Sequence, residues 1–141
     1  MMKSKQLFPF VLVVLVFILG CSDKVPLRGT VTFSDNGDPV PIGEVCFETP
    51  TSVSRGDIKP DGTYVVGTDG SADGIPKGTY NVVIYASQTT YTTNVIPGTN
   101  RTTETSQTKS LIHPKYNSPD SGLTFTVDGK KKTFDIKVDR P

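Results

Sequence analysis

The sequence has no tryptophan, only two cysteines and a single histidine, and these scarcities narrow the functions it can perform. No serine stands in a nucleophile-elbow motif, and the sequence places no cysteine or serine as a partner for His113, so nucleophilic catalysis is not indicated. Zinc-ligand spacing is also missing. His113 lies between Ile112 and Pro114, and we interpret it as a packing or surface residue. We therefore expect no enzyme activity and no cofactor.

An excess of positive charge is missing as well. The chain has 15 Lys and Arg against 14 Asp and Glu, which gives a formal net charge of +1. Proteins that bind nucleic acid normally show a basic face or stripe. The one basic cluster, at residues 129–133, has the composition of a solvated hairpin turn. We expect no nucleic-acid partner.

The N-terminus is strongly apolar, yet it lacks the length of a membrane span. The continuous apolar run covers residues 10–19, about half of the roughly 20 residues that a transmembrane helix needs. Lys3 and Lys5 precede the run and Gly20 follows it, which is the arrangement of a secretory signal peptide. The sequence predicts that residues 1–20 are a signal peptide that is removed. A buried N-terminal strand is the alternative.

Cys21 follows directly, and residues 18–21 read ILGC. This tetrapeptide resembles the lipobox of bacterial lipoproteins, in which the cysteine sulfur becomes a thioether to diacylglycerol before cleavage. The resemblance implies lipidation at Cys21, a tether over residues 21–24 and a membrane as partner, with several acyl chains giving a stable anchor. An aspartate after the cysteine would favour retention in the inner membrane, so Ser22 favours the outer membrane. An ordinary signal peptide that is cut elsewhere is the alternative.

Cys46 is the only other cysteine. A lipid on Cys21 would leave Cys46 without an intramolecular disulfide partner. In a strand, Cys46 shares one face with Glu44 and Glu48, and two carboxylates disfavour the thiolate that reactivity requires. We interpret Cys46 as a structural residue.

After the first 20 residues no window has a helical pattern, and apolar residues instead alternate with polar ones. Leu27, Gly29, Val31 and Phe33 share one face of the first such run, and turn signals rich in Gly and Pro separate the runs. Residues 25–141 are therefore predicted to form an all-β domain, an antiparallel β-sandwich of about seven strands. The predicted core contains Val45, Phe47, Val82, Ile84, Phe125 and Ile136.

Residues 87–108 interrupt this pattern as a threonine-rich insertion. The segment has nine threonines, and Pro97 and Gly98 lie near its middle. Its large apolar groups are only Tyr91, Val95 and Ile96, too few to offset an ordering cost of about 1 to 2 kcal/mol per residue. We expect a mobile loop that serves as the contact surface. The alternative is a pair of strands, because threonine and tyrosine are β-formers.

One further stretch has the spacing of a calcium loop. Asp69, Ser71, Asp73 and Gly74 occupy the first, third, fifth and sixth places of an oxygen-ligand loop, but Tyr80 stands at the twelfth place, where a bidentate glutamate belongs. Asp69, Ser71 and Asp73 are thus a weak calcium candidate, and we favour a plain turn without a metal.

Five short motifs follow one another along the mature chain. They contain Gly29 and Val31; Val45 and Phe47; Asp61, Gly62 and Tyr64; Pro76, Gly78, Tyr80 and Val82; and Lys115, Tyr116, Ser121, Gly122 and Leu123. In this order they resemble small bacterial lipoproteins with a carboxypeptidase regulatory-like domain. The resemblance implies a transthyretin-like (prealbumin-like) sandwich and covers nearly all of residues 25–141. A related fold serves a purine-pathway hydrolase that needs several histidines, which this chain does not have.

Together these features predict a non-catalytic, lipid-anchored protein of the cell envelope that acts as a binding or structural module for protein partners. We expect a monomer. The alternative is a carbohydrate-binding surface lipoprotein, although exposed aromatics are scarce and Tyr91 is the one aromatic in the insertion.

Overall fold

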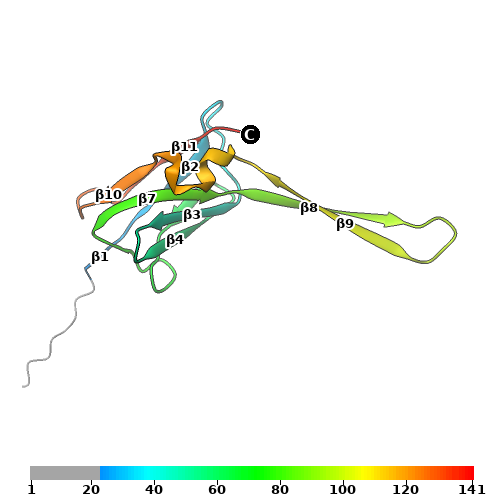
Figure 1. The fold of residues 1–141 in the computed structure, drawn as a ribbon, viewed down its shortest axis with the longest axis horizontal. Helices are drawn as coiled ribbons and strands as arrows, with labels where there is room; N and C mark the ends of the chain where they lie inside the picture. The colour runs from blue at the N-terminus through cyan, green and yellow to red at the C-terminus, as the bar shows by residue number, and fades with distance from the viewer. Residues whose placement is uncertain (1–22) are drawn as a thin grey trace, which may run out of the picture.

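The computed structural model describes residues 23–141, which form a β-sandwich with a long projecting hairpin (Figure 1). The strands are β1 (Lys24–Val25), β2 (Arg28–Phe33), β3 (Gly43–Glu48), β4 (Val53–Ile58), β5 (Thr63–Val65), β6 (Ile75–Pro76), β7 (Gly78–Tyr85), β8 (Ser87–Val95), β9 (Thr102–Ser110), β10 (Thr124–Val127) and β11 (Ile136–Val138). Two short 3-10 helices, η1 (Pro114–Asn117) and η2 (Pro119–Ser121), precede β10. Within residues 23–141, no helix has the length and hydrophobicity of a membrane span.

Two sheets form the sandwich. One has the order β10-β7-β3-β4 and the other β11-β2-β5, so the two together contain the seven strands that the sequence predicts. Two small pairs, β1 with β6 and β8 with β9, complete the topology. β11 runs parallel to β2, with Ile136 opposite Val31, whereas all the other strand pairs are antiparallel. The all-β sandwich is confirmed, with this one parallel pairing as an addition.

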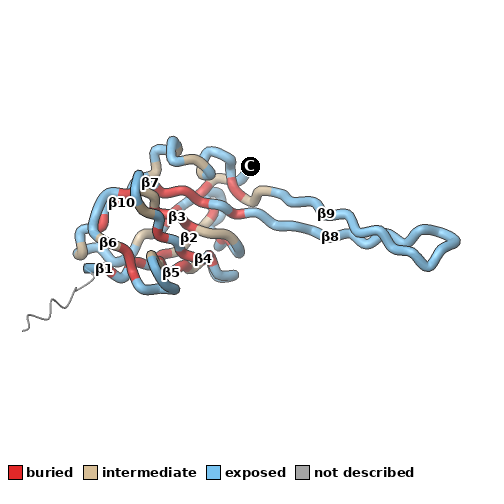
Figure 2. Tube along the Cα trace, turned by 60° about the horizontal axis from the view of Figure 1, so that its bottom comes forward, coloured by how far each residue is buried: buried red, intermediate tan, exposed pale blue. Residues whose placement is uncertain are grey.

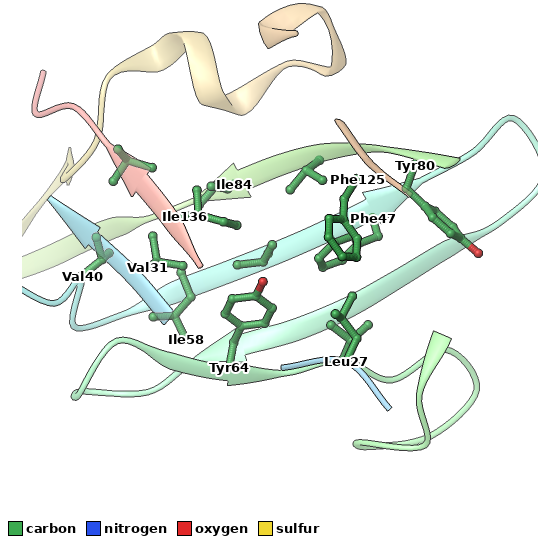
Figure 3. Packing of buried hydrophobic residues seen from close by; sticks show 14 of the residues in the cluster. Leu27, Val31, Val40, Phe47, Ile58, Tyr64, Tyr80, Ile84, Phe125 and Ile136 are labelled. Carbon is green, nitrogen blue, oxygen red and sulfur yellow. The ribbon is translucent and has the colours of Figure 1, made fainter. Parts of the chain in front are cut away.

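The core lies between the two sheets, as Figure 3 shows. The six residues that alternation assigns to the core are all buried, with exposed fractions between 0% and 7%. Phe47 on β3 is fully buried, and its ring centroid lies 6.3 to 6.4 Å from those of Tyr64, Tyr80, Phe125 and Phe134. Aromatic pairs at such distances, several of them edge-on, add to the stabilisation that burial provides.

The Asp61–Gly62 turn shows how a sequence motif becomes local structure. The Oδ1 atom of Asp61 accepts hydrogen bonds from the amide of Thr63 at 3.0 Å and from its hydroxyl at 2.6 Å. Gly62 has a φ of 82°, a left-handed value that favours glycine. The turn delivers Tyr64 into the core, where its hydroxyl donates a 2.5 Å hydrogen bond to the carbonyl of Phe134.

The segment η1–η2 ties the last strand to the domain. The Nδ1 atom of His113 accepts a hydrogen bond from the amide of Lys115 at 3.1 Å and so caps η1. Asp139, just after β11, accepts hydrogen bonds from Lys115 Nζ and from the hydroxyl of Tyr116. These bonds hold the pKa of Asp139 well below its usual range, at about 2. His113 and the Lys115–Tyr116 pair therefore have structural contacts here.

The expectation of a loop over residues 87–108 is wrong. β8 and β9 pair in register from Ser87 opposite Ser110 to Val95 opposite Thr102, and the hairpin stands away from the sandwich (Figures 1 and 2). We call residues 87–110 the arm. Its strands form without burial because β8 continues β7 with only the buried Ala86 between them, so the ladder grows from an ordered base. The amide of Leu111 bonds to the carbonyl of Ala86 at 2.9 Å and closes that base.

Candidate binding surface

The two ends of the molecule differ in character. β1, the first described strand, lies at one end of the sandwich, and the arm leaves from the other end (Figures 1 and 2). Cys21 precedes Lys24 of β1 by three residues and lies outside the described residues, so its lipidation stays a prediction. Any anchor at Cys21 would therefore enter the domain at the end opposite the arm.

At the β1 end, the structure brings together two of the three calcium candidates. Lys24 Nζ lies 2.5 Å from Asp69 Oδ2 and 2.5 Å from Asp73 Oδ2, so an ammonium group stands between the two carboxylates. The Lys24 hydrogen bond is the largest cause that lowers the pKa of Asp73, to about 2. Ser71 is exposed in the same loop. No group of three or more His, Cys, Asp or Glu side chains suited to a metal ion occurs among residues 23–141.

Cys46 lies inside the protein although it is not part of the core cluster. Its exposed fraction is 2%, and its thiol is free. Burial is the main cause that raises the pKa of the Cys46 thiol to about 12, and the charge of Glu44 adds to it. The sequence anticipated the carboxylates but not the burial, and both effects disfavour a reactive thiolate.

A shallow hollow beside β4 is another polar feature of the sandwich surface. Arg55, Asp57 and Thr68 contribute to its lining, together with Glu44. Arg55 Nη1 lies 3.7 Å from Glu44 Oε1, and Arg55 is largely exposed. Such an exposed ion pair contributes little to stability. The hollow has no histidine, no cysteine and no nucleophile held against a base.

The arm is the largest departure from a compact domain. All nine residues of β8 are exposed, and so are eight of the nine in β9. Tyr91 and Val95 are 71% and 68% exposed, which is high for large apolar side chains. β8 has no charged residue, whereas β9 carries Glu104 and Lys109. The arm thus offers threonine-rich faces, one strand without charge and two free edges.

The hydrogen bonds at the two ends of the arm show which backbone groups of β8 face β9 and which face its free edge. The amide of Ile96 bonds to the carbonyl of Arg101, and the amide of Leu111 bonds to the carbonyl of Ala86. Because inward and outward positions alternate along an antiparallel strand, the even-numbered residues of β8 direct their backbone groups toward β9. Thr89, Tyr91 and Thr93 therefore direct their N–H and C=O groups outward, to the free edge of β8.

Comparisons with known proteins add no relative. No protein-family model matches the chain, and neither a curated protein nor a solved structure shows significant similarity to it.

Proposed function

We propose that the chain is a non-catalytic, lipid-anchored protein of the cell envelope, attached to the outer membrane through Cys21, whose arm contacts a protein partner. The observation that carries this proposal is the placement of β1 and the arm at opposite ends of the sandwich. A lipid three residues before Lys24 would hold the β1 end at the membrane and leave the arm free at the opposite end of the domain.

The β1 end has the contacts that a tether requires. β1 pairs with β6, with Val25 opposite Ile75, and Lys24 bonds to Asp69 and Asp73 across the same end. Residues next to the anchor are thereby held to the domain. The motifs of the proposed carboxypeptidase regulatory-like domain support the same scaffold role, because their residues lie in turns, in the core and in the Asp139 contacts.

Metabolic labelling with a clickable fatty acid tests the anchor. We expect label on the wild-type chain and on Cys46→Ser, and none on Cys21→Ser. The matched cysteine variant separates loss of the lipid site from loss of a thiol in general. Equal labelling of wild type and Cys21→Ser would overturn the anchor.

Replacement of residues 88–107 by a short Gly-Ser linker tests the arm. The melting temperature should stay nearly unchanged, because the replaced residues are exposed. Capture of envelope proteins by the anchored chain should be lost. Retained capture would place the contact surface elsewhere.

Carbohydrate binding is the second candidate, favoured by the exposed ring of Tyr91 among threonine hydroxyls. Binding on a glycan array that is lost in Tyr91→Ala would favour it over a protein partner.

A further inference from the structure

The free edge of β8 lacks the features that keep edge strands from pairing. Exposed edges in natural proteins are blunted by charges, prolines, bulges or short length. β8 is nine residues long and has neither a charge nor a proline, and its pairing with β9 is unbroken from end to end. The other edge of the arm, β9, carries Glu104 and Lys109. The unprotected edge is therefore that of β8.

The sequence of β8 reads nearly the same in both directions from Tyr91. Thr90 and Thr92 flank the tyrosine, and Thr89 and Thr93 come next. Gln88 and Asn94 follow, both with a carboxamide. An antiparallel pair of identical strands related by a two-fold axis places each residue opposite its mirror position, so this near-palindrome matches like with like.

The alternation of inward and outward backbone groups along β8 is compatible with that two-fold symmetry. The two-fold axis that relates two identical antiparallel strands is perpendicular to their sheet. A residue next to this axis lies opposite its own copy. Tyr91 directs its N–H and C=O outward, so the two copies of Tyr91 can form a hydrogen-bonded pair. Thr89 and Thr93, which also face outward, extend the ladder on either side.

From these features we propose that the arm's partner is a second copy of this chain, joined by antiparallel pairing of the two β8 edges with Tyr91 opposite Tyr91. The proposal deepens the proposed function and rests on its assignment of the arm as the contact surface. It replaces the monomer that the sequence analysis expects. The product is a continuous four-stranded sheet with the order β9-β8-β8-β9.

The gain in stability comes from the sheet itself. A hairpin of two strands is marginal in water, and additional strands make it stable. The new cross-strand pairs are Tyr with Tyr, Thr with Thr, Gln with Asn and, at the ends, Ser with Val, and aromatic and threonine pairs across strands stabilise a sheet. No like charges meet at this edge, because β8 has none. The two sandwiches lie at opposite ends of the joined arms, as antiparallel pairing requires.

Disulfide trapping in cells that express the full chain tests the pairing. The Cα atoms of a hydrogen-bonded antiparallel pair are about 5.5 Å apart, which suits a disulfide. Tyr91→Cys should therefore give a covalent dimer on mild oxidation. Ser106→Cys is the matched control, because Ser106 lies opposite Tyr91 on β9. Its two copies would be about 14 Å apart, three strand spacings, and should not cross-link.

A charge variant tests the register independently. Thr89 of one copy lies opposite Thr93 of the other, so Thr89→Glu with Thr93→Lys places opposite charges together at both positions. Thr89→Lys with Thr93→Lys places like charges together instead. Both variants carry Thr93→Lys, opposite Glu104 within the same arm, and they differ only at position 89. Added to Tyr91→Cys, the Glu–Lys pair should retain the dimer band, and the Lys–Lys pair should reduce it several-fold.

The outcomes separate this inference from the proposed function. Absence of a Tyr91→Cys dimer, or equal dimer from Tyr91→Cys and Ser106→Cys above the background of the parent chain, would overturn pairing through β8. A cross-linked product of Tyr91→Cys with a mass other than twice that of the chain would also overturn self-pairing, while leaving the arm as a contact surface. Absence of fatty-acid label from the wild-type chain would overturn the anchor at Cys21 and leave the pairing of the arms unaffected.

Discussion

A side-chain carbon on Gly29 would lie 1.9 Å from the carbonyl oxygen of Phe134. The same carbon would lie 2.9 Å from the hydroxyl of Tyr64, which donates its hydrogen bond to that carbonyl. β2 and the segment before β11 therefore approach each other so closely that only glycine fits. The requirement is one of space, because the obstructing atoms belong mainly to the backbone and have no flexible end to move aside.

Gly29→Ala is the first prediction. We expect destabilisation of about 1 to 3 kcal/mol or more, as in overpacked cores. Gly70→Ala is the control, because the nearest atoms to a side-chain carbon there are 3.9 Å away. Urea denaturation of a soluble chain beginning at Ser22 measures both. Similar midpoints for the two variants would show that β2 and the Phe134 segment are not in close contact.

Phe47 gives the second prediction. Phe47→Ala should cost about 3 to 5 kcal/mol of unfolding free energy, because the ring is fully buried among four other aromatic rings. Tyr85→Ala removes an aromatic ring that is 47% exposed and should cost much less. Denaturant unfolding of the two variants measures both losses of unfolding free energy. A cost under about 1 kcal/mol for Phe47→Ala would place it on the outer face of β3.

The strands of the sandwich were predictable because the alternation of apolar and polar residues that indicates them is local in the sequence. Alternation placed Phe47 and Ile84 correctly, since strand residues that face a core repeat with a period of two. The arm was not predictable in the same way. Burial alone argues against ordering Tyr91 and its threonine neighbours. The compensating factor is the base of the arm, where Ala86 accepts a hydrogen bond from Leu111, a residue far from it in the sequence. The Lys24 contacts to Asp69 and Asp73 likewise join residues more than 40 positions apart, for which no local pattern exists.

Cys46 provides the third prediction. With its pKa raised to about 12, the thiol is almost entirely protonated at pH 8, and burial also blocks reagents. A thiol reagent should therefore modify native Cys46 far more slowly than unfolded Cys46. In a Tyr91→Cys chain, the new thiol stands at an exposed position and should react quickly in the native state. Rapid native labelling of Cys46 itself would contradict its burial.

The contact between Lys24 and Asp73 gives the fourth prediction. The folded-state pKa of Asp73, about 2, is below the value of about 3.9 for an unfolded chain. Its contribution is therefore fully present above the unfolded pKa and is lost as the pH falls from about 4 through 2. Asp73→Asn should lower the unfolding free energy at pH 6 and have a smaller effect at pH 2. An equal effect of the substitution at both pH values would count against the ionised contact.

The exchange of backbone amides in the arm gives the last prediction. Thr90, Thr92 and Asn94 direct their N–H groups toward β9, whereas Thr89, Tyr91 and Thr93 direct theirs outward. In dilute solution, amide exchange followed by NMR should therefore alternate along β8, with modest protection at the even positions, since an isolated hairpin opens readily.

Pairing of two arms would bond the outward amides as well. Raising the protein concentration should then slow exchange at Thr89, Tyr91 and Thr93 and leave Glu104 and Ser106, whose amides face the outer edge of β9, fast. Alternation that does not change with concentration would indicate a hairpin without self-pairing. Uniformly fast exchange would instead support the mobile loop that the sequence predicts.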